Sequence, residues 1–280
     1  MKLAHLILAH TNPVQLKRLV KQLAHPNADV FIHLDAKTDI NTFADLTDLP
    51  NTFFIKNRIK VNWCEYSTIQ ATLNAFEEIL NNGIIYSHIN LLSGADYPLK
   101  QASQIHDFLF ANTDKTFIHY DLIFSNWPEG QARISKYYFG DYRFPGRFQL
   151  TSLINKVLPH RKMPKDLPAY GRSQWLTITP VCARYAINYI KENKRLQRFF
   201  RKTFAIDEVF FQTILCNSPY RETLVNNNMR YIVLNDQYRP VTLTLTDADT
   251  LLSSGKFYAR KFDIDKDEAI FNYIDNAFLI

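Results

Sequence analysis

The stretch that decides the fold class is LLSGADYPLK, residues 91–100. The apolar run from Tyr86 to Leu92 predicts a buried strand, and the glycine-containing turn after it delivers one carboxylate, Asp96. Pro98 cannot continue that strand, because it has no backbone N–H for the ladder and its φ is fixed. Carboxylates at the carboxyl ends of strands in an open α/β sheet lie where such folds bind ligands. Asp96 is therefore a candidate site residue, although an acid that only caps its own turn explains the pattern equally well.

Strand and helix signals alternate through the first part of the chain. Short apolar runs predict strands at residues 3–9, 30–35, 53–55 and 116–120. Helix signals open at Asn12-Pro13, where an N-cap residue precedes proline, and at Ser67, and a further helix is expected at residues 105–110. This alternation is typical of an α/β fold with a mostly parallel, doubly wound sheet flanked by helices.

The second part of the chain has a different character. Residues 124–170 are rich in aromatic residues, Arg and Pro and have weak periodicity, which predicts long loops with short helices. Beyond them we expect helices at residues 180–192, 207–215 and 267–279, and strands at residues 230–233 and 241–245. No repeat, low-complexity tract or linker interrupts the sequence, so a single domain over residues 1–280 is the simplest expectation.

Composition narrows the class of protein and of partner. Hydrophobic residues make up 46% of the chain and charged residues 21%, which indicates a globular protein. The net charge of +6 suits an anionic partner, which could be a nucleotide diphosphate, an acidic glycan, an anionic membrane or a nucleic acid. Charge alone does not choose among these. A basic surface of this kind would also allow peripheral contact with the inner face of a cell membrane.

Cysteine usage and the first residues point to a compartment. Cys64, Cys182 and Cys216 lie far apart without metal-ligand spacing, which favours a reducing environment. No apolar run approaches the length of a membrane span, and residues 1–10 read as a first strand and not as a signal peptide. The expected location is the cytoplasm.

Two adjacent acids, Asp207 and Glu208, begin an otherwise apolar helix. Adjacent side chains point about 100° apart on a helix, so one acid can cap the helix while the other faces a cleft. Asp207 fits the cap because it comes first, and Glu208 fits a general base. Capping by both acids is the plainer interpretation.

A basic, aromatic segment, GKFYARKFD at residues 255–263, is a second candidate. Lys256, Tyr258 and Arg260 would share one face of a strand, but Phe257 and Lys261 break the alternation, so we expect a loop. Lys and Arg in such a loop could neutralise a leaving diphosphate. An ordinary solvated loop explains the same residues.

Two further sequence patterns each allow a functional and a structural interpretation. Asp247-Ala248-Asp249 has the D-x-D form that many sugar-nucleotide enzymes use to hold a divalent metal, yet Thr246 before it and the leucines after it favour a helix start. The tryptophans at positions 63, 127 and 175 lie among polar residues, and aromatic faces beside hydrogen-bonding groups suit sugar rings, although most aromatic residues are core.

Taken together, these segments resemble the core-2/I-branching β-1,6-N-acetylglucosaminyltransferase family, glycosyltransferase family 14, which includes the peptide O-xylosyltransferases. The resemblance covers nearly the whole chain and is closest to short bacterial members. It rests on LILAH at 6–10, FIHLD at 31–35, Asn62-Trp63 with Ser67, Ser93 to Leu99, Gly171 to Thr177, Ile206-Asp207-Glu208, and Ala259 to Asp263. The membrane anchor and paired cysteines of the animal members are missing, which favours a cytoplasmic bacterial protein.

The resemblance implies a GT-A-like fold and inverting transfer from a UDP-sugar, with no divalent metal or other cofactor expected. Residues 1–120 would form the nucleotide-binding half and residues 121–280 the acceptor and catalytic half. Glu208 matches the catalytic base, and Lys261 matches the lysine that binds the donor diphosphate in place of a metal. An arginine would assist it, with Arg239 and Arg230 as the candidates.

The resemblance also implies the residues that contact the two substrates. Two segments match donor contacts, namely Val61-Asn62-Trp63 and Asp96-Tyr97-Pro98. Arg133, Lys136 and Trp175 are the acceptor candidates in the aromatic middle of the chain.

The leading hypothesis is an inverting, metal-independent transferase that moves a sugar, GlcNAc, to a cell-surface glycan or its lipid-linked precursor, with no nucleic-acid partner. The first alternative is a metal-dependent sugar-nucleotide transferase that uses Asp247 and Asp249. The second is a non-catalytic basic module that binds glycans or nucleic acid.

Overall fold

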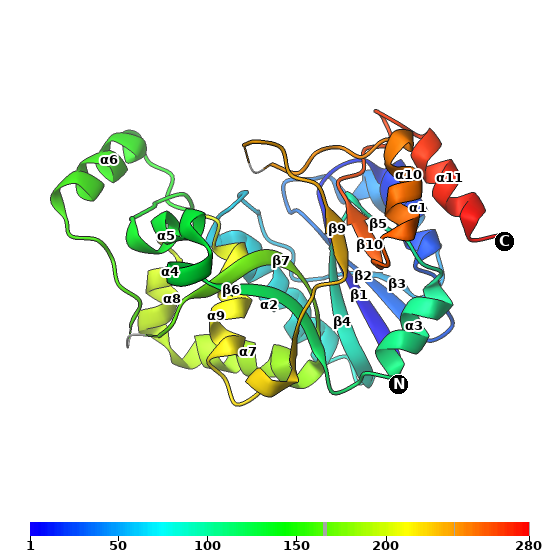
Figure 1. The fold of residues 1–280 in the computed structure, drawn as a ribbon, viewed down its shortest axis with the longest axis horizontal. Helices are drawn as coiled ribbons and strands as arrows, with labels where there is room; N and C mark the ends of the chain where they lie inside the picture. Colours follow the sequence, from blue (N-terminus) through cyan, green and yellow to red (C-terminus); the bar gives the residue numbers. More distant parts are fainter. Residues whose placement is uncertain (165–166, 238, 280) are drawn as a thin grey trace. The chain divides into compact units, whose positions relative to one another are not determined.

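The structure is a computed structural model that describes residues 1–164, 167–237 and 239–279 (Figure 1). The chain packs as two compact units. The first unit consists of Met1–Lys56, Gly83–Thr113 and Met229–Ile280, and the second of Asn57–Asn82 and Asp114–Asn228. Each unit therefore takes segments from both sides of residue 120. The expected single domain and its division at that residue stay predictions.

The first unit contains a parallel sheet. It runs in the order β3-β2-β1-β4, formed by Thr52–Phe54, Ala28–Leu34, Lys2–Ala9 and Tyr86–Ser93. Each neighbouring pair is parallel. The seven side chains of β2 are all buried, as expected for a strand of a covered parallel sheet. The predicted α/β class with a mostly parallel sheet is confirmed.

A smaller, three-stranded sheet completes the strands of the first unit. β10 (Tyr258–Arg260) lies between β5 (Asp96–Pro98), which is antiparallel to it, and β9 (Arg230–Ile232), which is parallel. Pro98 is tolerated because β5 is an edge strand, where not every N–H needs a partner. The predicted loop over residues 255–263 is wrong in its centre, because β10 pairs on both sides. The predicted strand at residues 241–245 is also wrong, since no strand forms there.

The helices of the first unit are α1 (Pro13–Gln22), η1 (Ile40–Leu46), α3 (Ala102–Phe110), η5 (Leu245–Asp247), α10 (Ala248–Ser253) and α11 (Ala269–Ala277). Among them, α1 and α11 follow the predicted cap and periodicity closely. The Asn12 side chain accepts a hydrogen bond from the backbone N–H of Gln15 and so caps α1. α11 buries Ile270, Phe271 and Ile274, the apolar face expected from their spacing.

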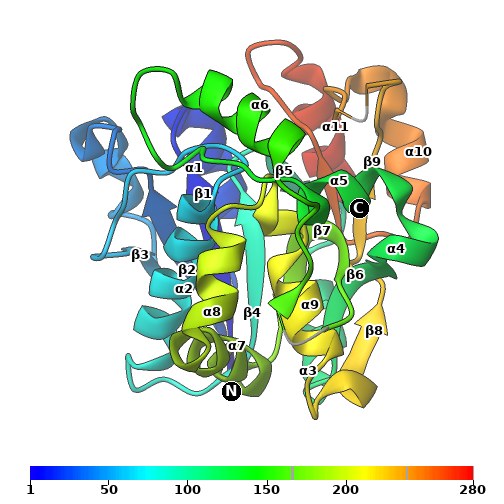
Figure 2. The ribbon, with the colours of Figure 1, turned by 90° about the vertical axis from the view of Figure 1, so that its left-hand side faces the viewer.

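The second unit is a three-stranded sheet with helices. β6 (Thr116–Leu122) lies between β7 (Tyr170–Ile178), antiparallel to it, and β8 (Leu224–Asn226), parallel to it. α9 (Phe210–Cys216) packs on β7, and α7 (Pro180–Glu192) contacts α2 (Tyr66–Leu80), α8 (Lys194–Phe200) and α9 (Figure 2). The remaining elements are α4 (Ile123–Asn126), α5 (Pro128–Ser135), α6 (Arg147–Val157), η3 (Ile206–Glu208) and η4 (Arg221–Thr223).

The start of α2 corrects one prediction. The helix begins at Tyr66, with Glu65 at the N-cap position and no side-chain cap hydrogen bond. Ser67 is therefore not the cap. Its hydroxyl donates instead to Asp141 at 2.9 Å, and its backbone N–H also donates to that carboxylate. The serine thus joins α2 to the loop before α6.

Candidate active site

Glu208 is held by an arginine within the second unit. It ends η3, the single turn before α9, and its side chain is 35% exposed. The Arg133 guanidinium of α5 donates a hydrogen bond to the Glu208 carboxylate. The same guanidinium lies over the Trp127 indole, 4.6 Å from the ring centroid, and Arg172 approaches that ring at 5.7 Å. The structure therefore brings the predicted base and one predicted acceptor residue into contact.

Two glycines allow this packing. A Cβ on Gly171 of β7 would lie 2.6 Å from the Trp127 ring and 2.7 Å from the carbonyl oxygen of Glu208. A Cβ on Gly130 of α5 would lie 2.6 Å from the same ring. A Cβ atom does not approach other atoms this closely, so glycine at these positions lets β7, α5 and Trp127 come together. Gly171 also lets β7 approach the backbone of Glu208.

One predicted donor segment lies next to η3. The backbone N–H of Ala205, which precedes η3, donates to the carbonyl of Cys64 at 2.8 Å. Cys64 and Ala205 both have left-handed backbones, with φ of 61° and 46°. Non-glycine residues rarely adopt this region, and such strain gathers at functional sites. The contact brings Val61-Asn62-Trp63 close to the predicted base.

Asn62 and Trp63 differ in how they are held. The Asn62 amide donates to Asp141 at 3.2 Å and accepts from Arg143, while its backbone N–H donates to Ser67. Trp63, by contrast, is 82% exposed. An open indole face suits stacking on a base or a sugar ring. Val61 is half-buried.

Asp207 does not cap the helix, so that prediction is wrong. The residue is buried, and η3 has no side-chain cap hydrogen bond. One Asp207 carboxylate oxygen has no hydrogen-bond partner among the described residues. Burial, and then the neighbouring charge of Glu208, raise the pKa of Asp207 to about 7. Asp207 is thus a second protonatable group beside the predicted base.

Glu65 and Cys64 extend this group of perturbed side chains. Burial, and then the charge of Asp141, raise the pKa of Glu65 to about 7. Burial also raises the pKa of the Cys64 thiol well above its ordinary value, which keeps it neutral. Sequence patterns gave no sign of Glu65, because its partial burial comes from residues distant in the chain, such as Gly140, whose missing side chain leaves room for the Glu65 carboxylate.

In the first unit, two further predicted donor segments meet. Arg260 of β10 lies opposite Asp96 of β5 in the ladder, and its guanidinium is 3.4 Å from that carboxylate. The next residue but one, Phe262, donates its backbone N–H to Ala95 at 2.9 Å. Lys261 lies between these contacts, exposed and without an ion pair among the described residues. Arg260, which directly precedes Lys261, was not among the candidate partner arginines, and its guanidinium lies against Asp96.

The side chains of Asp96, Tyr97 and Pro98 are buried. Asp96 accepts hydrogen bonds from the Ser93 backbone N–H at 2.9 Å and from its hydroxyl at 3.0 Å. The Tyr97 hydroxyl donates to Asp275 of α11 at 2.6 Å. These contacts stabilise the turn after β4. The assignment of the three residues to the donor site stays a prediction, and their burial favours a structural role.

The two candidate arginines lie in different surroundings. Arg230 of β9 is buried, donates to Asn90 and to the Leu91 carbonyl, and lies over the Tyr258 ring. Burial lowers the pKa of Arg230 to about 10. Arg239 is exposed in a turn closed by its backbone N–H and the Asn235 side chain at 3.0 Å. Of the two, Arg239 has the accessible guanidinium.

The surroundings of the other two acceptor candidates, Lys136 and Trp175, give less support for acceptor binding. Lys136 is exposed at the end of α5. Trp175 is buried in β7, which leaves little of its ring for a sugar. Their roles stay predictions.

The two acids of the D-x-D pattern each have a local partner. Asp247 accepts from the Thr244 backbone N–H at 2.8 Å in a capping box, so Thr244 and not Thr246 is the N-cap. Asp249 accepts from the Tyr273 hydroxyl at 2.6 Å. Within residues 1–164, 167–237 and 239–279, no group of three or more His, Cys, Asp or Glu side chains could hold a metal ion.

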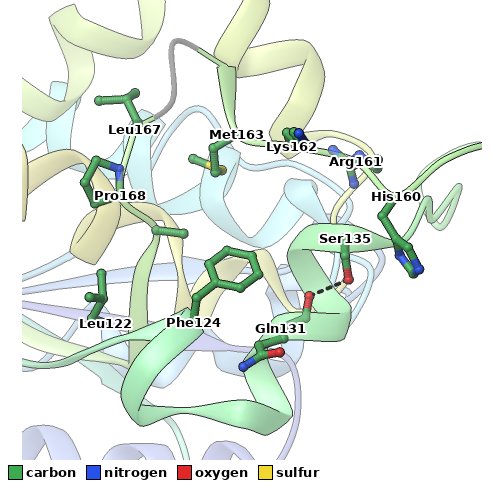
Figure 3. Close-up of a pocket in the computed structure, with 11 residues that line it drawn as sticks. Leu122, Phe124, Gln131, Ser135, His160, Arg161, Lys162, Met163, Leu167 and Pro168 are labelled. Atoms are coloured by element: carbon green, nitrogen blue, oxygen red, sulfur yellow. Dashed lines mark hydrogen bonds between the residues drawn. The ribbon is translucent and has the colours of Figure 1, made fainter.

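The second unit also contains a cavity of about 630 Å³ that the sequence did not indicate. Figure 3 shows Phe124 and Met163 pointing toward one another across it, and Gln131 and Ser135 of α5 on one side. Other lining residues are Leu122, His160, Arg161, Lys162, Leu167, Pro168 and Ala169. The cavity is lined mainly by apolar groups, with cations at one end.

Comparison with known proteins decides the family. The family model described as Core-2/I-Branching enzyme matches residues 3–250, which is most of the chain and includes every predicted site residue except Lys261. The chain belongs to the Core-2/I-Branching enzyme family. The resemblance inferred from the sequence is confirmed.

Curated relatives of this family member are transferases by name. The chain is 26% identical over 222 residues to "Xylosyltransferase oxt" of Drosophila pseudoobscura pseudoobscura, with 77% of this chain and 24% of that protein covered. It is 26% identical to "Xylosyltransferase 2" of Rattus norvegicus, covering 82% and 26%. It is 27% identical to "Beta-glucuronosyltransferase GlcAT14B" of Arabidopsis thaliana, covering 99% and 66%. The chain thus spans about a quarter of the xylosyltransferases it matches.

Solved structures are more distant. Mouse xyloside xylosyltransferase 1 in its apo form gives a TM-score of 0.37 at 11% identity, covering 80% of this chain and 84% of that one. A glucose-1-phosphate thymidylyltransferase from Bacillus anthracis gives 0.36 at 9%, covering 70% and 78%. Scores this low do not establish a shared fold, so the GT-A-like assignment stays a prediction.

Proposed function

We propose that this family member is an inverting glycosyltransferase that moves a sugar from a UDP-sugar to a hydroxyl group of a glycan. Membership of the family supports the reaction class, and the names of the relatives agree with it. The observation that carries the assignment of the base is the Glu208–Arg133 contact above Trp127. It gives a carboxylate that is both partly exposed and fixed in position.

Glu208 would act as the general base. Its carboxylate takes the proton of the acceptor hydroxyl as that oxygen bonds to the anomeric carbon, and the bond from that carbon to the UDP oxygen breaks. The configuration inverts because attack and departure occur on opposite faces. Arg133 would hold the carboxylate in line and contact the acceptor, since it lies on the same carboxylate and is itself partly exposed.

Cationic side chains would neutralise the leaving diphosphate. Lys261 has an exposed ammonium group, and Arg239 has an exposed guanidinium on the segment whose Val241 carbonyl accepts from the Lys261 backbone N–H at 3.3 Å. Lys and Arg can stabilise charge that develops on a departing phosphate oxygen. We therefore propose that the reaction needs no divalent metal.

The donor sugar and the acceptor are the finer part of the proposal. We propose GlcNAc as the sugar, and a cell-surface glycan or its lipid-linked precursor as the acceptor. Xylose and glucuronic acid, for which the relatives are named, are the competing sugars. Trp63 offers an aromatic face to the donor through its exposed indole.

Release of UDP from UDP-GlcNAc, UDP-xylose and UDP-glucuronic acid, with and without EDTA, tests this function. We expect slow hydrolysis or transfer with one donor, unchanged by chelation. Loss of activity in EDTA would favour the metal-dependent alternative with Asp247 and Asp249. If no UDP-sugar binds and nucleic acid binds with steep salt dependence, the chain is a basic binding module.

Location and membrane contact are separate proposals. No helix among the described residues is long and apolar enough to cross a bilayer. We propose that the protein works in the cytoplasm, in peripheral contact with an anionic membrane.

A further inference from the structure

α6 of the second unit buries none of its side chains. Figure 1 shows it standing apart from α4, α5 and α8 on long connections. Leu150, Leu153 and Val157 are 40%, 57% and 70% exposed. Their spacing of three and four residues places them on one face of the helix. The result is an apolar stripe that faces solvent.

Polar side chains outside the stripe attach the helix to its unit. Asn155 donates from its amide to the Tyr137 carbonyl at 2.8 Å and accepts from the Tyr137 backbone N–H at 2.7 Å. Arg147 donates to the Gly140 carbonyl at 2.8 Å. The helix is thus anchored through polar contacts, and these contacts do not involve its apolar stripe. Packing within the second unit does not explain the stripe.

Two other exposed apolar side chains flank the stripe, because Phe144 precedes the helix and Leu158 follows it. Phe148 is exposed too, but it lies on the opposite face of the helix, where the Arg147 guanidinium covers its ring at 4.6 Å. Single exposed apolar residues are ordinary, but a contiguous group marks a surface that binds something. We call Leu150, Leu153 and Val157, together with Phe144, Leu158 and the exposed cations described next, the α6 surface.

The charge of this region points to an anionic partner. Residues 142–164 contain five cations, Arg143, Arg147, Lys156, Arg161 and Lys162, and no Asp or Glu. Arg143, Lys156 and Lys162 are exposed. A second copy of this surface would bring like charges together in an isologous contact, which disfavours a dimer through α6. Anionic lipid offers both negative phosphates and an apolar interior.

We propose that the α6 surface docks the protein on an anionic lipid bilayer. The helix lies in the plane of the interface, its Leu150, Leu153 and Val157 stripe enters the boundary between headgroups and acyl chains, and the exposed cations contact lipid phosphates. This inference gives the proposed membrane contact a specific surface. It does not depend on the sugar-transfer chemistry.

Vesicle flotation of the full chain tests the proposal, with phosphatidylcholine alone or mixed with phosphatidylglycerol. We expect wild type to float with the anionic vesicles only. Leu153→Gln with Val157→Gln should lower binding at least about tenfold, because interfacial burial of two apolar side chains is lost. Lys156→Gln with Lys162→Gln should lower it by about fivefold for each cation removed.

Matched controls come from exposed positions elsewhere in the second unit. Val181→Gln changes an apolar side chain of α7 that is 50% exposed, and Lys194→Gln with Arg195→Gln removes two exposed cations of α8. Both should float like wild type. UDP release in the absence of vesicles should be the same for all these variants, so a failure of the sugar-transfer proposal would be seen separately.

Three results would overturn the proposal. One is a wild-type chain that does not float with anionic vesicles. Another is a stripe variant that floats as well as wild type. The third is a wild-type dimer in sedimentation that Leu153→Gln with Val157→Gln dissociates, which would make a second copy the occupant of the α6 surface.

Discussion

The Glu208 carboxylate lies between a cation, Arg133, and a second acid, Asp207, and these neighbours have different roles. Arg133 is separated from Glu208 by 75 residues of sequence, and it fixes the position of the carboxylate. Asp207 is adjacent in sequence and buried, and it holds its proton to near neutral pH. The family resemblance indicated Glu208 and Arg133 separately, but no local pattern could show that they touch.

Removal of the Arg133 guanidinium tests its positioning role. Arg133→Gln should lower kcat by about 10- to 100-fold, because a base that is free to move loses its alignment with the acceptor hydroxyl. Arg133→Lys should recover part of the rate, and UDP affinity should not change. Initial-rate kinetics with separate kcat and KM values check this, with Arg195→Gln, an exposed cation of α8, as the control. Wild-type rates in Arg133→Gln would exclude the role.

Asp207 should make stability depend on pH. Its pKa of about 7 in the folded chain exceeds the ordinary value of 3.8, so the folded state binds more protons and stability falls as pH rises from about 4 to 7. A shift of this size corresponds to roughly 4 kcal/mol. Asp207→Asn should remove the part of this stability loss between about pH 4 and 7 that comes from Asp207.

Urea unfolding at several pH values between 4 and 8 measures the effect. Some pH dependence should remain in Asp207→Asn, because the pKa of Glu65 is also raised, to about 7. An Asp207→Asn variant with the same pH dependence as wild type would contradict the buried, proton-holding role.

At the scale of elements, most long periodic segments were predictable and short paired strands were not, although the nine-residue strand β7 was missed as well. The helix beginning at Thr179-Pro180 and the strand beginning near Leu3 agree with the structure, since caps and apolar runs are local signals. β5 and β10 are three residues each and form through pairing between Asp96 and Arg260, which lie far apart in the chain. A local pattern cannot reveal such pairing, so residues 255–263 read as a loop.

The junction of β7, α5 and η3 depends on glycine. Gly171→Ala would place a methyl group 2.6 Å from the Trp127 ring and 2.7 Å from the Glu208 carbonyl. We expect a loss of stability of about 1–3 kcal/mol and a further loss of turnover, because the backbone of Glu208 must shift. Thermal unfolding and transfer assays measure both.

Gly94→Ala is the matched control for stability, because its Cβ would have no neighbour nearer than 3.6 Å. If Gly171→Ala unfolds and reacts like wild type, the close packing of η3 on β7 is not required.

At the scale of the molecule, the predicted site residues divide between two units. Glu208, Arg133 and the Val61-Asn62-Trp63 segment belong to the second, while Lys261, Arg239 and the Asp96-Tyr97-Pro98 segment belong to the first. Each unit joins segments that are distant in sequence, so the sequence patterns could not predict its composition. The parallel sheet of the first unit was predictable, because alternating strands and helices reveal it.

Experiments should distinguish the predicted catalytic residues of the second unit from the predicted diphosphate-binding residues of the first. Lys261→Gln should weaken UDP binding about 10- to 100-fold, the value of a charge-assisted hydrogen bond. Isothermal titration with UDP measures this, with Lys21→Gln, an exposed lysine of α1, as the control. UDP affinity equal to wild type in Lys261→Gln would remove that amine from the diphosphate site.

The most direct test of general-base catalysis is the transfer rate of Glu208→Gln with the donor and acceptor that the wild type uses, measured in EDTA alongside UDP affinity. We expect the rate to fall by about 10²- to 10⁴-fold, the contribution of a positioned base, with UDP affinity unchanged. Glu222→Gln, an exposed glutamate of the same unit, should keep wild-type rates. A Glu208→Gln variant that transfers sugar at the wild-type rate would contradict the account.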